Sequence, residues 1–176
     1  MKKIFIVVVL ILTAIACQKG VISSELEKFR SDLDVESNNK IIITQVFEAI
    51  DKVDTLKVKE LLTTDFNLTA PGITEPFGVV ELVQAIKAHY TSFPDWKHDV
   101  EHMLAKNNKV IARVMQSGTH EVEYEGIPAT NNQVLKAAVY EITIVDGKIK
   151  KLWVIEDNLG FYMQLGMELQ IKETKN

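Results

Sequence analysis

The sequence predicts a single α+β domain in which helices come first and an antiparallel sheet follows. Apolar residues recur at helical spacing in three segments between residues 41 and 90. From residue 97 onward the apolar period changes to two, which is typical of strands. Three helices followed by a run of strands form an α+β domain, because helices can cover one face of the sheet. A chain of 176 residues is long enough to bury a core of its own.

The first helix is expected over residues 41–53, where apolar side chains recur at the spacing of one helical face: Ile42, Val46, Phe47, Ile50 and Val53. Asp54 is expected to cap a short second helix over the stretch TLKVKELL. The next stretch, FNLTAPGITEPFG, is rich in turn residues and is expected to be a loop. A third helix is expected from about Val79 to Tyr90.

Strands are expected at about 97–106, 109–122, 133–145 and 148–157. The pair Asp146–Gly147 predicts a tight hairpin turn between the last two strands, because both residues tolerate positive φ. The segment NLGFYMQLGMELQ is expected to close the domain as a short helix or turn.

The first residues have the pattern of a targeting segment. Lys2 and Lys3 precede an apolar run, Ile4 to Ile15, that is shorter than the roughly 20 residues of a spanning helix. The tetrapeptide AIAC resembles a bacterial lipobox, which implies cleavage before Cys17 and lipidation of that residue. A plain secretory signal that leaves a free thiol is the alternative. Since Cys17 is the only cysteine, no disulfide within the chain is possible.

This pattern divides the chain into a signal peptide (1–16), a lipidated tether (17–38), one folded domain (39–170) and a C-terminal tail (171–176). The expected location is the cell envelope, at the outer membrane if the source is diderm, with the membrane as a partner through Cys17. A net charge of −4 and the lack of any long basic run exclude nucleic acid as a partner.

The last strand ends in two acids, Glu156 and Asp157, that must face opposite ways. Side chains alternate along a strand, so Asp157 shares a face with Trp153 and Ile155, while Glu156 shares the other with Val154. We expect the Trp153 face to line a pocket, because a flat indole suits the wall of a small-molecule site. A carboxylate in such a pocket is a candidate acid or base. The alternative is that Asp157 caps the turn that follows.

Several short motifs give the chain a resemblance to a known family. In chain order they are FPD at 93–95, GTH at 118–120, GIPAT at 126–130, DGKI at 146–149, Trp153, Asp157 with Gly160, and QLG at 164–166. With this order and spacing, residues from about Lys40 to Leu169 resemble the SnoaL-like polyketide cyclase, or ester cyclase, family of the nuclear transport factor 2-like superfamily.

The resemblance implies a cone-shaped, curved antiparallel sheet wrapped by three helices around a pocket. It implies that Asp157 is the catalytic acid–base, which removes a proton α to a carbonyl so that the enolate closes a ring. His120 falls on the GTH histidine of the pocket. A small hydrophobic molecule is the implied partner, a homodimer through the exposed sheet face is possible in this superfamily, and no metal or organic cofactor is implied.

Strand alternation places Gln116 and His120 on one face of their strand, so both are expected to line the pocket, although a strand-face His120 half exposed to solvent is an equal alternative. His98 and His102 lie four residues apart on a strand, about 13 Å, which is too far for one metal ion. No metal site is therefore expected.

Ala129 and Asn131 replace the second proline and final glycine of the family's GxPPTG motif, and the stretch DFNLTAPG lacks a histidine common there. The sequence leaves three functions open: an envelope enzyme acting on an apolar carbonyl compound, a lipoprotein that only binds a hydrophobic ligand, and a dimeric interaction module.

Overall fold

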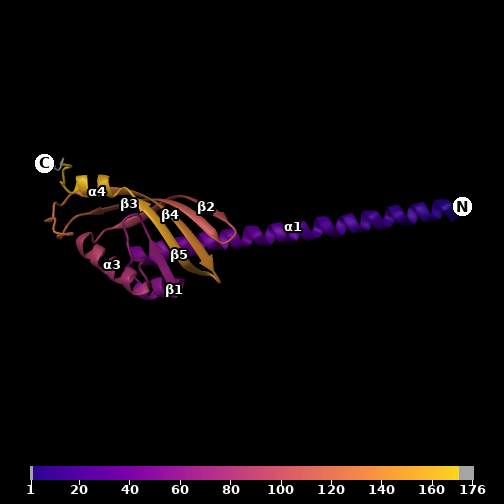
Figure 1. Cartoon of the computed structure of the whole chain (residues 1–176), viewed down its shortest axis with the longest axis horizontal. Helices are drawn as coiled ribbons and strands as arrows, with labels where there is room; N and C mark the ends of the chain where they lie inside the picture. The colour runs from indigo at the N-terminus through magenta and orange to yellow at the C-terminus, as the bar shows by residue number, and fades with distance from the viewer. Residues whose placement is uncertain (1, 171–176) are drawn as a thin grey trace, which may run out of the picture.

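The computed structural model describes residues 2–170, with side chains described from residue 23 onward. The predicted tail (171–176) lies outside the described residues. The elements, in chain order, are α1 (Lys2–Asp51), α2 (Thr55–Leu61), β1 (Leu62–Thr69), α3 (Val79–Ser92), β2 (Lys97–Lys106), β3 (Lys109–Thr119), β4 (Gln133–Val145), β5 (Lys148–Glu156) and α4 (Asn158–Gln164). They form a single α+β domain, as predicted, with a curved sheet over α3 and the end of α1 (Figure 1).

The sheet has five strands in the order β1-β5-β4-β3-β2. The four predicted strands pair antiparallel, but β1 joins β5 in parallel, so the sheet is mixed and the expectation of a purely antiparallel sheet is wrong. Sequence reasoning missed β1 because three consecutive polar residues, Thr63, Thr64 and Asp65, separate Leu62 from Phe66 and leave no alternation of apolar and polar residues. The pairing of β1 with β5 is also irregular, with a register shift between Leu62 and Asn67.

Helix α1 is longer than predicted and includes residues 17–38, the segment that was expected to be a tether. Residues 23–38 are mostly exposed, and close packing begins at Asn39, whose side-chain amide donates to the carbonyl of Asn107 at 2.8 Å. Figure 1 shows this helix projecting from the domain and ending beneath the sheet. Within residues 23–170, no helix is both long and apolar enough to span a membrane.

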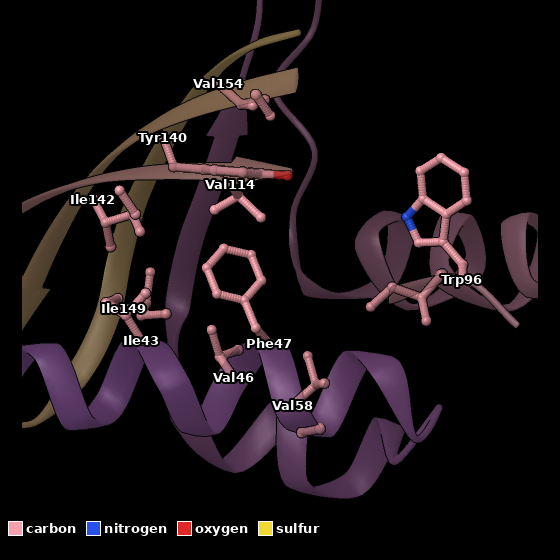
Figure 2. Packing of buried hydrophobic residues seen from close by; sticks show 14 of the residues in the cluster. Ile43, Val46, Phe47, Val58, Trp96, Val114, Tyr140, Ile142, Ile149 and Val154 are labelled. Carbon is pink, nitrogen blue, oxygen red and sulfur yellow. The ribbon is translucent and has the colours of Figure 1, made fainter. Parts of the chain in front are cut away.

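The last turns of α1 supply one wall of the core. Ile43, Val46 and Phe47 are buried against the inner face of the sheet. Figure 2 shows Phe47 reaching from α1 toward Val114 and Tyr140, and its ring centroid lies 5.2 Å from that of Tyr140. Burial of these apolar side chains is what fixes α1 to the sheet.

Two local predictions are confirmed. The carboxylate of Asp54 accepts the backbone N–H of Lys57 at 3.0 Å and so caps α2. Asp146 and Gly147 both have positive φ, 49° and 74°, and form the tight turn between β4 and β5.

The FPD and GTH motifs meet where α3 passes into β2. Asp95 accepts the backbone N–H of Thr119 at 2.6 Å and its hydroxyl at 2.8 Å, and these bonds hold the pKa of Asp95 below its usual value. Gly118 makes this approach possible, because a Cβ there would lie 2.6 Å from Cε3 of Trp96. The two motifs therefore anchor the β2 end of the sheet to α3.

Candidate functional site

A cavity of about 790 Å³ lies between the end of α1, α3 and the inner face of the sheet. This volume is within the usual range for small-molecule sites. Most of the side chains that line it are apolar, among them Phe47, Ile86, Leu152 and Val154. The few polar groups on its wall are therefore the ones able to orient a bound molecule.

A row of polar side chains crosses the inner face of the sheet along this cavity. His98 of β2 lies opposite Gln116 of β3, and Gln116 lies opposite Lys136 of β4. Glu156 of β5 completes the row beside Lys136, and all four residues line the cavity. The row is continuous because directly opposed side chains in antiparallel strands have Cβ atoms only about 5 Å apart.

Buried Lys136 and half-buried Glu156 form an ion pair, with Lys136 Nζ 2.8 Å from one carboxylate oxygen of Glu156. The second oxygen accepts the side-chain amide of Gln116 at 3.2 Å. The Lys136 ammonium also lies 5.0 Å from the ring centre of Phe161, in cation–π contact. Burial of charges requires such partners, so the pair is held in one arrangement at the cavity wall.

Gln116 also donates to the hydroxyl of Tyr140, which lies four residues beyond Lys136 along β4 and lines the cavity. Burial, and next the negative charge of Glu156, raise the pKa of Tyr140 well above its usual value. Tyr140 therefore stays protonated. Its hydroxyl hydrogen has no acceptor among the described residues and remains available to a ligand.

A second polar cluster joins the end of α1 to β2. The carboxylate of Asp51 lies 2.6 Å from Nδ1 of His98 and accepts the hydroxyl of Tyr90 at 3.0 Å. It also accepts the backbone N–H of His98 at 3.2 Å. The imidazole of His98 stacks on Phe47, with ring centroids 5.1 Å apart, so the ring has a fixed position.

His89 of α3 is a further titratable group at the cavity. Its imidazole stacks on Phe93 at 4.9 Å, and its Nε2 is buried without a hydrogen-bond partner within residues 23–170. Burial, with a smaller contribution from the positive charge of Lys136, lowers the pKa of His89 to about 3. His89 is therefore neutral at physiological pH.

Comparison with known proteins assigns the fold to a family. Residues 40–165 match the family described as SnoaL-like polyketide cyclase, which is more than half of the chain. The chain belongs to the SnoaL-like polyketide cyclase family. A search of curated proteins found no match to the sequence.

Solved structures agree with this family fold. AclR from Streptomyces galilaeus is 21% identical, with a TM-score of 0.68 over 74% of this chain and 97% of AclR. IdmH from Streptomyces antibioticus is 24% identical, with a TM-score of 0.68 over 73% of this chain and 99% of IdmH. TsrD from Streptomyces laurentii is 21% identical, with a TM-score of 0.66 over 74% of this chain and 96% of TsrD. At these identities the likeness concerns the fold.

In this SnoaL-like domain the outward and inward faces of β5 are the reverse of the prediction. Trp153 and Ile155 are 40% and 48% exposed on the outer face of the sheet, whereas Leu152, Val154 and Glu156 line the cavity. The expectation that Trp153 and Ile155 form the pocket wall is wrong. The reason is that α1 and α3 cover the face defined by Val154, and residue alternation alone does not reveal which face is covered.

Asp157 lies outside the cavity. It is exposed and is the N-cap of α4, where its carboxylate accepts the backbone N–H of Gly160 at 2.8 Å. This is the capping alternative that the sequence left open. The acid that the strand turns into the cavity is its neighbour, Glu156.

Of the other two predicted residues, Gln116 lines the cavity and His120 does not. His120 is buried in the core, where it stacks on Phe93 at 5.1 Å and its Nδ1 accepts the backbone N–H of Thr130 at 3.3 Å. It is therefore neither half exposed nor in a common cavity with Asp157. The prediction that His120 and Asp157 share a pocket is wrong.

The polar residues of the cavity that sequence reasoning missed include His89, His98, Lys136, Tyr140 and Glu156. Alternation along β4 does place Lys136 and Tyr140 on one face, but only the strand register shows that Lys136 lies opposite Gln116. The cavity offers no ready metal site, because residues 23–170 hold no group of three or more side chains placed to bind a metal ion.

The capping role of Asp157 predicts that two substitutions at this position differ in their effect on stability. Asp157→Ala removes the acceptor for the Gly160 amide and is expected to lower the free energy of unfolding by about 1 kcal/mol. Asp157→Asn keeps an acceptor and is expected to change it by only a few tenths of a kcal/mol, as measured by urea unfolding. Equal losses in both variants would contradict the capping assignment.

His89 predicts a pH dependence of stability. The pKa of His89 is about 3 in the folded chain and about 6.5 in the unfolded chain. Between these values only the unfolded chain binds the proton, so the contribution of His89 to the free energy of unfolding is fully present above pH 6.5 and is lost progressively as the pH falls toward 3. At pH 5 the free energy of unfolding is expected to be about 2 kcal/mol lower than above pH 6.5, at roughly 1.4 kcal/mol per pH unit.

The variant His89→Phe keeps the stacking ring but cannot be protonated. Between pH 7.5 and pH 5 we expect the free energy of unfolding of this variant to fall by about 2 kcal/mol less than that of the parent chain, measured by chemical unfolding at both pH values. The exposed His102 provides the control, because His102→Phe should leave the pH dependence as in the parent. The same pH dependence in all three proteins would refute the assignment.

Proposed function

We propose that the cavity binds a small, largely apolar carbonyl compound and that the chain acts on it as a cofactor-independent cyclase or isomerase. The observation that carries the proposal is the apolar cavity of about 790 Å³ with one continuous row of polar groups on its sheet wall. Apolar walls favour a hydrophobic body, and a few convergent polar groups orient it.

The polar groups fit a carbonyl ligand better than a charged one. The hydroxyl of Tyr140 is a neutral donor with a free hydrogen, which suits a carbonyl oxygen. The one cation on the sheet wall, Lys136, is already paired with Glu156 at 2.8 Å, so it is not free to neutralise an anionic ligand. Membership of the SnoaL-like polyketide cyclase family supports the same class of substrate.

Ligand binding without catalysis is the second candidate function. One observation favours it: both carboxylate oxygens of Glu156 are occupied, by Lys136 and Gln116, and Asp157 lies outside the cavity. In this case the same cavity would hold a hydrophobic molecule and return it unchanged.

The proposal includes export and anchoring. The apolar run and the AIAC motif make the chain an envelope lipoprotein with lipid on Cys17, at the outer membrane in a diderm source. The side chain of Cys17 lies outside the described residues. The long exposed part of α1 would then hold the domain away from the membrane.

A homodimer is the proposed assembly. The outer face of the sheet carries apolar side chains that are well exposed in the single chain, among them Leu135 at 55%, Trp153 at 40% and Ile155 at 48%. They lie on the two neighbouring strands β4 and β5. A second copy of the chain would cover this face.

The cavity predicts that one inward substitution blocks binding. Leu152→Trp places an indole inside the cavity and is expected to weaken binding of the neutral, carbonyl-bearing dye Nile red at least tenfold, measured by fluorescence titration of the full chain. Ile155→Trp, on the outer face of the same strand, is the matched control and should bind like the parent. Undiminished binding to Leu152→Trp, or no binding to the parent, would count against the proposed site.

The proposed anchor predicts that lipid is attached to the sulfur of Cys17. In a bacterial host the parent chain is expected to incorporate labelled palmitate and to remain with the membrane fraction, whereas Cys17→Ser should do neither. A parent chain that is secreted and cleaved without label would support the plain secretory signal instead.

A further inference from the structure

We propose that His98 is the catalytic acid–base of the cavity and that Asp51 is its positioning residue. This rests on the proposed function, since it names the group that would move the proton in that site. No motif in the sequence pointed to either residue. The proposal stands on the cluster of Asp51, His98 and Tyr90 at the junction of α1 and β2.

Asp51 is placed to hold His98 rather than to stabilise its own helix. It is the last residue of α1, where a negative charge is unfavourable to the helix dipole. Its carboxylate instead accepts three hydrogen bonds, from the ring and the backbone N–H of His98 and from the hydroxyl of Tyr90. Burial, and then the charge of Asp51, raise the pKa of Tyr90, so Tyr90 remains a donor to this carboxylate.

This arrangement selects one tautomer of His98. A carboxylate 2.6 Å from Nδ1 accepts a hydrogen bond from an N–H at that position, so the neutral imidazole carries its hydrogen on Nδ1. Nε2 then has a free lone pair and forms no hydrogen bond within residues 23–170. Because His98 lines the cavity and its side chain is only 9% exposed, Nε2 is the nitrogen that a bound molecule can meet.

A hydrogen-bond donor lies near this base. Phe47 contacts both His98 and Tyr140, with ring centroids 5.1 Å and 5.2 Å apart, so the two polar groups flank one aromatic ring (Figure 2 shows Phe47 and Tyr140). Gln116 lies opposite His98 across the strands and donates to the Tyr140 hydroxyl. His98 and Tyr140 line the same cavity, so the proposal places the carbonyl oxygen on the Tyr140 hydroxyl and the α-carbon toward Nε2 of His98.

The chemistry is a proton transfer that needs no other reactant. Nε2 of His98 takes a proton from the carbon α to the carbonyl, and the C–H electron pair becomes the enolate, whose oxygen accepts the hydroxyl hydrogen bond of Tyr140. The imidazolium, stabilised by Asp51, then returns the proton to a different carbon or to the new alkoxide. The first route is an isomerisation. In the second, the enolate carbon attacks a second carbonyl carbon of the same molecule, a C–C bond forms, and the electron pair of that carbonyl moves to its oxygen as the alkoxide that takes the proton; this is an intramolecular aldol cyclisation, and both routes conserve all atoms.

Glu156 is a weaker candidate for this role. Its two oxygens accept from Lys136 and Gln116, so removal of a substrate proton would break the ion pair. The Nε2 atom of His98 has no such partner to lose. Glu156 and Lys136 therefore act on the position of Gln116 rather than on the substrate.

The test measures exchange of the α-hydrogens of 2-tetralone for deuterium in D2O by NMR, with the purified full chain. The parent is expected to exchange them faster than buffer. His98→Gln should lose about a hundredfold or more of that rate while 2-tetralone still binds. Asp51→Asn should lower the rate with little change in binding, and the exposed His102→Gln on the same strand should match the parent.

A second measurement does not depend on the probe. Long-range proton–nitrogen correlation spectra of the parent are expected to show His98 protonated on Nδ1, and Asp51→Asn should lose this fixed tautomer. A hydrogen on Nε2 of the neutral ring would overturn the inference, as would an exchange rate that His98→Gln leaves unchanged.

The two proposals can fail separately. Binding of 2-tetralone without exchange above buffer would overturn the role of His98 and leave the binding site in place. If 2-tetralone does not bind at all, the proposed substrate class fails, and the tautomer of His98 alone decides whether Asp51 positions its ring.

Discussion

The site depends on one constraint: α1 and α3 cover a single face of the sheet, and a strand can present only alternate side chains to that face. On β5 this turns Leu152, Val154 and Glu156 toward the helices, and Trp153 and Ile155 away from them. The same constraint applies on β2 to β4, where it sets His98, Gln116 and Lys136 in one row. The polar wall of the cavity is thus a consequence of which face is covered.

Phe47 links the core to this wall. It is buried in the packing that fixes α1 to the sheet, and its ring also lies against both His98 and Tyr140. The last residue of the same helix, Asp51, holds His98 from the other side. The residues that dock α1 on the sheet therefore also position the imidazole of His98, the candidate base.

Period-two patterning predicted four strands close to their observed bounds, and Asp54 and the Asp146–Gly147 turn were predicted from turn and cap chemistry. These features depend on neighbours in the sequence. The covered face of β5 and the parallel pairing of β1 depend on contacts between distant segments, so local patterns could not predict them. For the same reason the 2.6 Å contact between Asp51 and His98, 47 residues apart, left no signal in the sequence.

The most direct measurement of the central claim is the set of intermolecular NOEs between bound 2-tetralone and methyl-labelled side chains of β5. If α1 and α3 enclose the cavity against the inner face, the probe's aromatic protons should give NOEs to the methyl groups of Leu152 and Val154 and none to Ile155. NOEs to Ile155 with none to Leu152 or Val154 would show that the ligand lies on the outer face and would contradict the account.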